Sequence, residues 1–184
     1  MTKLMERVNK MQQGPGLDEK TQIGPQVSRE QQERILNYIG IAQKEGAKLA
    51  CGGDAPKGDL AKGYYVKPTI FTGVNNDMRI AQEEVFGPVL ALMVADDFED
   101  AMRLANWVKF GLSASIVSRD LTRVHQFINR IEAGLITVNL PTAGVEYQLP
   151  FGGTKELSFG MREQGPLALD FYTETRTVYL KYTQ

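Results

Sequence analysis

Helical and strand-like patterns alternate along this chain with short links between them, and this alternation limits its fold more than any other feature of the sequence. Apolar residues at helical spacing predict helices over residues 1–13, 28–46, 97–106 and 121–131. Short apolar and β-branched runs between them predict strands over 47–51, 66–71, 111–117 and 134–139. Such alternation is typical of an α/β domain, so we expect a layered, largely parallel sheet.

The second predicted helix carries capping residues at its start. Ser28 is suited to the N-cap position because its hydroxyl can accept a backbone N–H. Gln31 stands three residues later and completes a capping-box pattern. The sequence therefore predicts a helix that begins at Ser28 and runs to about Gly46.

The composition changes after Gly165 and Pro166. A short helix is expected over 167–172, and residues 173–182 are rich in β-branched and aromatic types that favour a strand. This predicted strand has no hairpin partner in the sequence, and an unpaired edge invites pairing with another chain. We therefore divide the chain into residues 1–166, which hold the α/β layers, and residues 167–184, a terminal helix and oligomerisation strand.

Composition and charge exclude several classes of partner. The chain has 184 residues, 42% of them hydrophobic, and 21 basic against 22 acidic side chains, so no excess of positive charge favours nucleic acid or an anionic membrane as a partner. No signal-like segment or apolar run of roughly eighteen residues predicts export or a membrane span. A single cysteine, Cys51, forms no intramolecular disulfide. We expect a cytoplasmic protein without nucleic-acid or membrane partners.

The stretch Gln-Glu-Glu-Val-Phe-Gly-Pro-Val at residues 82–89 concentrates the chemistry of the chain. It places two carboxylates, an aromatic ring and a Gly-Pro turn ahead of the apolar run 89–94, which predicts a buried strand. Taken alone, Glu83 and Glu84 are also compatible with a solvated pair that caps the preceding segment. The candidate site therefore lies at the entrance of a strand.

Several further segments accompany this stretch in a characteristic order. They are residues 18–26, 45–53, 63–69, 150–153, Lys155, 162–165 and 171–178. In this order and at these separations, the set resembles the C-terminal part of the NAD(P)-dependent aldehyde dehydrogenases, and the resemblance runs through nearly the whole chain. It implies the C-terminal part of that family's catalytic domain, followed by the terminal strand through which subunits associate.

The resemblance also implies roles for four side chains. Glu84 would accept hydrogen bonds from the hydroxyls of the ribose next to nicotinamide, and Phe86 would lie against the nicotinamide end of NAD or NADP. Gln31 would contribute to the cofactor surface, although a polar residue on an early helical turn is more often a cap or a solvated side chain. Phe151 would form a wall of the aldehyde tunnel, or would simply pack before a flexible turn.

No catalytic residue is expected in this chain. The family's nucleophilic cysteine, general-base glutamate, oxyanion asparagine and dinucleotide-binding domain would all precede Met1, so the resemblance implies a C-terminal fragment that is inactive alone. Cys51 ends a predicted strand without a nearby histidine or basic cluster and is expected to be a buried structural thiol. His125, the only histidine, is expected at the edge of a helix. No residues have metal-ligand spacing.

Two segments indicate a branch of the family. Residues 139–145 and 156–165 look like the branch that acts on ketoglutarate semialdehyde and related aldehydes. The expected function is therefore a part of an oxidoreductase that oxidises a small aldehyde to an acid with NAD or NADP, as a dimer or tetramer assembled through the terminal strand. The alternative is a non-catalytic α/β interaction module that keeps the assembly surface.

Overall fold

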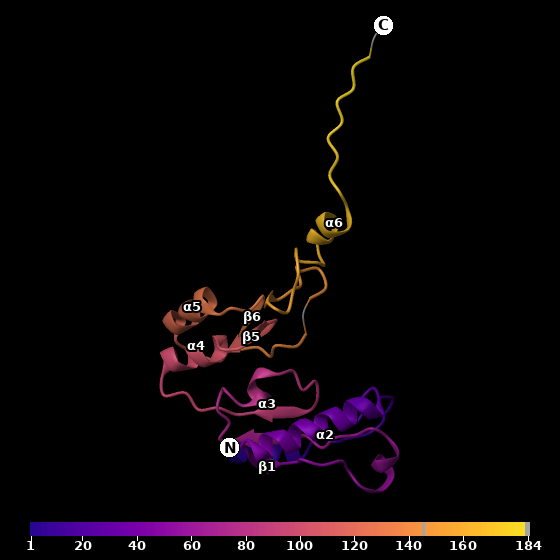
Figure 1. Cartoon of the computed structure of the whole chain (residues 1–184), viewed down its shortest axis with the longest axis vertical. Coiled ribbons are helices and arrows are strands. Elements are labelled where there is room, and N and C mark those ends of the chain that lie inside the picture. Colours follow the sequence, from indigo (N-terminus) through magenta and orange to yellow (C-terminus); the bar gives the residue numbers. More distant parts are fainter. Residues whose placement is uncertain (145, 183–184) are drawn as a thin grey trace. The chain divides into compact units, whose positions relative to one another are not determined.

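A computed structural model of the chain describes residues 1–144 and 146–182 (Figure 1). Val145, in the predicted branch-specific segment, and residues 183–184, at the end of the predicted terminal segment, lie outside the described residues. The contacts divide the chain into two units, Met1–Asp96 and Asp97–Gln184. Within this described part of the chain, every helix is too short or too polar to span a bilayer.

The first unit contains a three-stranded mixed sheet. Its elements in chain order are α1 (Thr2–Asn9), α2 (Arg29–Lys44), β1 (Lys48–Cys51), the 3-10 helix η1 (Gly58–Lys62), β2 (Thr69–Thr72), α3 (Arg79–Gln82) and β3 (Val89–Ala91). The strand order is β1-β2-β3, in which β1 runs antiparallel and β3 parallel to the central strand β2. Thr69 pairs with Val89, so the segment that precedes β3 reaches the sheet at the first residue of β2.

One face of α2 makes the core of the first unit. Ile35, Ile39 and Ala42 recur at helical spacing and are buried, together with Val66 and Phe71 from the sheet region. Burial of apolar surface of this kind is the main favourable contribution to folding. At its start, the Ser28 Oγ accepts the backbone N–H of Gln31 at 3.3 Å, which confirms the predicted N-cap.

The described residues of the second unit form two short pairs of strands and three helices. Its elements are α4 (Phe98–Asn106), β4 (Phe110–Gly111), β5 (Ser113–Ile116), α5 (Leu121–Arg130), β6 (Leu135–Val138), β7 (Thr154–Lys155) and α6 (Leu167–Tyr172). Strands β5 and β6 pair in parallel with α5 between them in sequence, which is a β-α-β unit, and β4 pairs antiparallel with β7.

Helices α4 and α5 are joined by apolar and ionic contacts. Met102 of α4 and both Val124 and Phe127 of α5 are buried. Arg130 donates two hydrogen bonds to the carboxylate of Glu99, at 2.7 and 2.5 Å. The second unit is therefore small but has its own apolar contacts, with a bidentate ion pair between the first turn of α4 and the last turn of α5.

The structure confirms the α/β class and corrects several details. The strand predicted over 89–94 is only three residues long and is not buried: Leu90 is 42% and Val94 92% exposed. The strand predicted over 66–71 begins later, at Thr69. Leu121, which helical spacing from Val124 also predicts to face inward, is 73% exposed, whereas Val124 is buried. A largely parallel sheet was expected, but the three-stranded sheet is mixed and β4 pairs antiparallel with β7. Hydrophobic periodicity does not indicate the direction in which strands pair.

The terminal segment 173–182 is neither helix nor strand in the single chain. It is the plain yellow trace that follows α6 in Figure 1, and its residues are exposed. A β-strand is defined by hydrogen bonds to a neighbouring strand, and no described residue of this chain supplies them. The terminal strand therefore stays a prediction. The predicted boundary at residue 166 likewise stays a prediction.

Removal of the cap of α5 should destabilise the second unit. The carboxylate of Asp120 accepts the backbone N–H groups of Thr122 and Arg123 at 2.9 and 3.2 Å. Asp120→Ala leaves both donors without this partner, and we expect a loss of about 1 kcal/mol in the free energy of unfolding. Urea titration measures it. Glu19→Ala, which removes an exposed carboxylate, is the control, and equal losses in both variants would refute the capping role.

Candidate functional site

Residues 83–88 connect α3 to β3 and lie along helix α2; we call them the glutamate loop. The loop begins where the four-residue helix α3 ends, and it enters the sheet at Val89. It contains Glu84 and Phe86, two of the side chains for which a cofactor role is predicted. The third, Gln31, is on α2 and contacts the loop directly.

The first glutamate of the loop is an anchor. The Glu83 carboxylate accepts the Nε and Nη2 hydrogens of Arg79, both at 2.8 Å, and the hydroxyl of Tyr38 at 2.6 Å. The hydrogen bond to Glu83, with the charge of that carboxylate, raises the pKa of Arg79 above its ordinary value. The ion pair with Arg79 fastens the start of the loop to α3, and the hydrogen bond from Tyr38 fastens it to α2.

The middle of the loop is held through its backbone. Arg34 donates to the carbonyl oxygen of Glu84 at 2.9 Å, and the Gln31 side-chain amide donates to the carbonyls of Val85 and Phe86 at 3.2 and 2.9 Å. Both amide hydrogens of Gln31 are thereby used. Three consecutive carbonyl groups of the loop thus accept hydrogen bonds from side chains of one helix.

The packing below the loop separates the two candidate side chains from the core. Val85, between them, packs against the core of the first unit. Gly87 lies so close to α2 that a Cβ there would stand 2.5 Å from Cδ1 of Ile35, a fully buried residue. Glu84 is exposed and Phe86 is 70% exposed. The loop therefore presents a carboxylate and an aromatic ring to the outside.

Phe86 has a left-handed backbone, with φ of 54°. A non-glycine residue in this region costs of the order of 1 kcal/mol or more and persists only when its surroundings demand it. Here the demand comes from the two neighbours, Val85 in the core and Gly87 against α2, and from the bond that Gln31 makes to the Phe86 carbonyl. Strain of this kind is typical of functional loops.

The loop presents a hydrogen-bond acceptor, the Glu84 carboxylate, and an exposed aromatic ring, that of Phe86. Among the described residues, no hydrogen bond or ion pair engages the Glu84 carboxylate. An ionised carboxylate can accept two hydroxyl hydrogens at once. A shallow pocket of about 370 Å³ adjoins Phe86 and is lined also by Gln26, Gly87 and Pro88. The arrangement suits a ligand with neighbouring hydroxyl groups and a flat ring.

Gln31 differs in part from its predicted behaviour. Its backbone N–H completes one half of the capping box, but its side chain does not return to Ser28 and instead holds the glutamate loop. The amide oxygen of Gln31 accepts no hydrogen bond from the described residues. Arg34 and Tyr38, which contact the same loop, were missed by the sequence reasoning. Their spacing of three and seven residues from Gln31, one face of a helix, was the available signal.

Phe151 belongs to the second unit and is half-buried. Its backbone forms an isolated antiparallel bridge with Glu163: the N–H of each residue donates to the carbonyl of the other, at 2.7 and 3.2 Å. Beside it, the N–H of Gly153 donates to the Ser158 hydroxyl at 2.6 Å, and Arg162 donates to the Gly153 carbonyl. The segment around Phe151 is thus held by residues 158–163 of the same unit.

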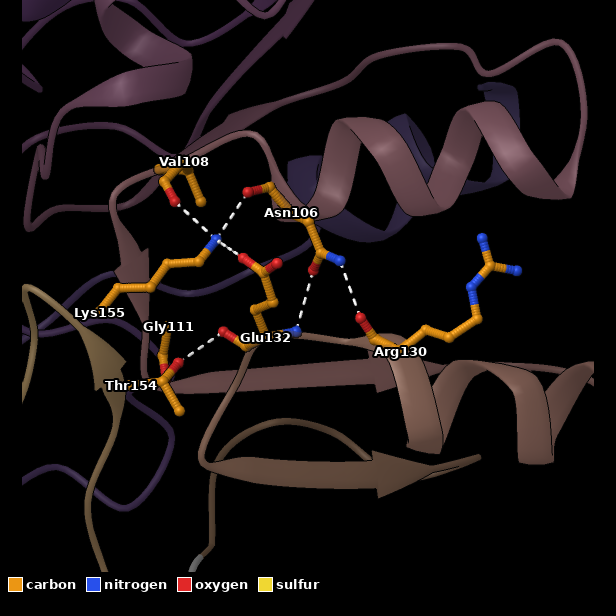
Figure 2. A network of polar contacts seen from close by, with 7 residues as sticks. All are labelled: Asn106, Val108, Gly111, Arg130, Glu132, Thr154 and Lys155. Atoms are coloured by element: carbon orange, nitrogen blue, oxygen red, sulfur yellow. Dashed lines mark hydrogen bonds and ion pairs between the residues drawn. The ribbon is translucent and has the colours of Figure 1, made fainter.

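Lys155 ties this segment to the rest of the second unit (Figure 2). Its ammonium donates to the carbonyl oxygens of Asn106 and Val108 at 2.6 and 2.9 Å and forms an ion pair with Glu132 at 2.5 Å. Three acceptors match the three hydrogens of an ammonium group. The neighbouring Thr154 hydroxyl donates to the Glu132 carbonyl at 2.7 Å. Lys155 is therefore a structural residue that joins β7 to the end of α4.

Cys51 and His125, neither of which is expected to be catalytic, have the following positions. Cys51 is half-buried, less than predicted, and its thiol contacts the Pro68 carbonyl at 3.8 Å. His125 is exposed on α5, as expected for a helix edge. Among the described residues, no cluster of three or more His, Cys, Asp or Glu side chains could hold a metal ion.

The chain belongs to the aldehyde dehydrogenase family, whose sequence profile matches residues 1–178. The predicted membership is confirmed. An alpha-ketoglutarate semialdehyde dehydrogenase of Haloferax volcanii is 47% identical over 184 residues, which are 99% of this chain and 38% of the relative. The alpha-ketoglutaric semialdehyde dehydrogenase of Bacillus subtilis is 47% identical over 180 residues, which are 97% of this chain and 37% of that protein. The likeness to this branch is therefore confirmed as well.

Solved structures agree with this assignment. A Mycobacterium tuberculosis aldehyde dehydrogenase complexed with NAD+ matches with a TM-score of 0.90 at 37% identity, over 100% of this chain and 38% of that one. A betaine aldehyde dehydrogenase from Staphylococcus aureus in complex with NAD+ matches with a TM-score of 0.89 at 35% identity, over 93% and 34%. The chain thus spans little more than a third of the proteins it resembles.

Loss of the Lys155 ammonium should weaken the second unit. Lys155→Met removes three polar contacts whose acceptors include two backbone carbonyls, so we expect a loss of about 2 kcal/mol in the free energy of unfolding. Lys109→Met is the matched control, because it removes the same charge from an exposed ion pair with Glu156, worth about 0–1 kcal/mol. Chemical denaturation compares the two, and equal losses would show that the Lys155 network is no more than a surface ion pair.

Proposed function

We propose that this chain is the C-terminal part of the catalytic domain of an NAD(P)-dependent aldehyde dehydrogenase, which oxidises an aldehyde to a carboxylic acid. Its contribution is a contact to the nicotinamide ribose and one wall of the substrate tunnel. The observation that carries the proposal is the contrast between two adjacent glutamates. Glu83 is fully engaged by Arg79 and Tyr38, whereas Glu84 is exposed and without a partner among the described residues.

The residues of the glutamate loop fit a nicotinamide nucleotide. The Glu84 carboxylate would accept the two neighbouring ribose hydroxyls, and the exposed ring of Phe86 would limit the range over which the nicotinamide moves. The amide oxygen of Gln31 would add a further acceptor. When bound, NAD or NADP supplies the acceptor of the hydride that leaves the aldehyde carbon. The part played by this chain is to orient, because orientation at a reacting centre is worth orders of magnitude in rate.

The substrate side of the proposal rests on Phe151 and on the relatives. Phe151 would contribute an aromatic wall to the aldehyde tunnel, and the bridge to Glu163 would keep it in place. Because alpha-ketoglutarate semialdehyde dehydrogenases share 47% of the aligned residues, the semialdehyde of ketoglutarate is the first aldehyde to test. We place the nucleophile outside this chain, because the hydrogen-bond partner of the Cys51 thiol in the described part of the chain is a backbone carbonyl, that of Pro68, rather than an activating base.

Assembly through the terminal segment completes the proposal. Val178, Tyr179, Leu180 and Tyr182 are 69%, 92%, 73% and 87% exposed, and their backbone has no strand partner within the described chain. Such a segment is stabilised when it pairs with a strand of another subunit. A homo-oligomer, either a dimer or a tetramer, would therefore form around residues 173–182.

The role of Glu84 can be tested in a hybrid enzyme. Residues 1–184 would replace the aligned region of the Haloferax volcanii relative, which supplies the remainder of an aldehyde dehydrogenase. Glu84→Gln removes the charge but keeps the size of the side chain. We expect the hydride-transfer rate, measured by NADH absorbance in single turnovers, to fall roughly tenfold or more because the cofactor is less well placed.

Two controls define the outcome of that experiment. Glu33→Gln removes an exposed glutamate of α2 and should leave the rate unchanged. The chain alone should oxidise no aldehyde, and turnover that disappears in a Cys51→Ser variant would overturn the assignment of the nucleophile to another part of the enzyme. A hybrid that folds and assembles but shows no turnover would favour the non-catalytic interaction module, and an unchanged rate in Glu84→Gln would return Glu84 to the role of a surface charge.

The terminal segment can be tested by deletion. Light scattering after gel filtration should give a self-associated species for the full chain, most simply a two-fold dimer, and a smaller species for a chain that ends at Phe171. The reason is that the deletion removes the exposed apolar side chains and the unpaired backbone of residues 173–182. A monomeric full chain, or the same oligomer for both proteins, would contradict the proposal.

A further inference from the structure

We infer that Tyr38, Arg79 and Glu83 are positioning residues, which hold the glutamate loop so that the Glu84 carboxylate and the Phe86 ring meet the cofactor in one arrangement. None of the three faces the cofactor in this inference, and each acts through the backbone of the loop. The inference rests on the proposed function, because it assigns a role to groups that support Glu84.

Glu83 stands at the C-terminus of α3, a position that by itself does not favour a carboxylate. Glu83 follows the last residue of α3, and a carboxylate at a helix C-terminus faces the partial negative charge of the helix end. Arg79, one turn earlier, offsets this with its bidentate pair, and its guanidinium also lies 5.4 Å from the centre of the Tyr38 ring. Each of the three side chains thus contacts the other two. These contacts fix the position at which the loop begins.

Tyr38 connects this set to the core. Its side chain is only 8% exposed, and its hydroxyl donates to Glu83 across 45 residues of sequence. A buried hydroxyl that donates to a carboxylate makes one of the stronger kinds of hydrogen bond. Tyr38 therefore fixes the position of the Glu83 carboxylate relative to the long helix α2, and not only relative to α3, which is four residues long.

The anchor is the first of three points at which α2 contacts the loop. Tyr38 holds Glu83, Arg34 holds the carbonyl of Glu84, and Gln31 holds those of the next two residues. Each contact lies one turn further toward the N-terminus of α2. Loss of the first contact would free the backbone immediately before Glu84, and the strained φ of Phe86 would have less to maintain it.

The test is a double-mutant cycle in the hybrid enzyme described above. Tyr38→Phe removes only the hydroxyl that bonds to Glu83, and Glu84→Gln removes the charge of the proposed ribose acceptor. We expect Tyr38→Phe to raise the KM for NAD and to lower the single-turnover hydride-transfer rate, together by about tenfold. In the Glu84→Gln background, the same substitution should change neither quantity by more than about twofold, because the group that it positions has lost its function.

Loss of stability does not imitate this result. Tyr38→Phe also weakens the fold, but the shift of the thermal midpoint should be equal with Glu84 and with Gln at that position. Tyr64→Phe is the matched control, since that hydroxyl makes no hydrogen bond among the described residues and its ring lies under Arg29. The control should leave the KM for NAD unchanged.

The possible failures are distinguishable. An unchanged enzyme after Glu84→Gln overturns the proposed function. If Glu84→Gln slows hydride transfer but Tyr38→Phe has no effect, the positioning role is overturned and the proposed function stands. The same holds if Tyr38→Phe has an equal effect in enzymes with Glu84 and with Gln at that position. If a hybrid variant does not fold, NMR of the 184-residue chain decides. A positive φ brings the amide hydrogen and the Hα of Phe86 close together, which gives a strong NOE cross-peak within that residue. This cross-peak should weaken in Tyr38→Phe and persist in Tyr64→Phe. A cross-peak unchanged in both variants would overturn the inference.

Discussion

The approach of Gly87 to helix α2 is the contact on which the candidate site depends. No side chain fits between this backbone and Ile35, because a Cβ at residue 87 would stand 2.5 Å from the Ile35 Cδ1. Ile35 in turn is fully buried in the core of the first unit. The loop is thereby pressed onto a helix face, and the exposure of Glu84 and Phe86 follows, since Val85 between them is directed to the core.

The same face of α2 supplies the polar contacts of the loop. Apolar residues of α2 make the core, and the polar residues at its edge, Gln31, Arg34 and Tyr38, reach the loop backbone and Glu83. A loop held only by apolar packing could slide, because the hydrophobic effect is not directional. Hydrogen bonds to successive carbonyl groups fix its register along the helix.

In the second unit, a charged side chain, Lys155, holds the segment that carries the candidate residue Phe151. The segment that contains Phe151 is held by a backbone bridge to Glu163 and by the Lys155 ammonium, which satisfies carbonyl groups at and just beyond the end of α4 (Figure 2). Two candidate contributions to one enzyme, a cofactor contact and a substrate wall, are thus each supported by side chains that do no chemistry themselves. Such supporting groups are what give a site its accuracy.

The sequence by itself determined the α/β class, the approximate helices, the cap at Ser28 and the family to which the chain belongs. These follow from local patterns, since periodicity, capping and motif order are properties of neighbouring residues. Tertiary structure decided which of two adjacent glutamates is held and which is free, because the Tyr38 hydroxyl that reaches Glu83 comes from a helix 45 residues away, whereas Arg79 is a local partner four residues earlier. It also decided the mixed sheet and the short, exposed β3. Strand order and burial depend on contacts between distant segments, which no local pattern contains.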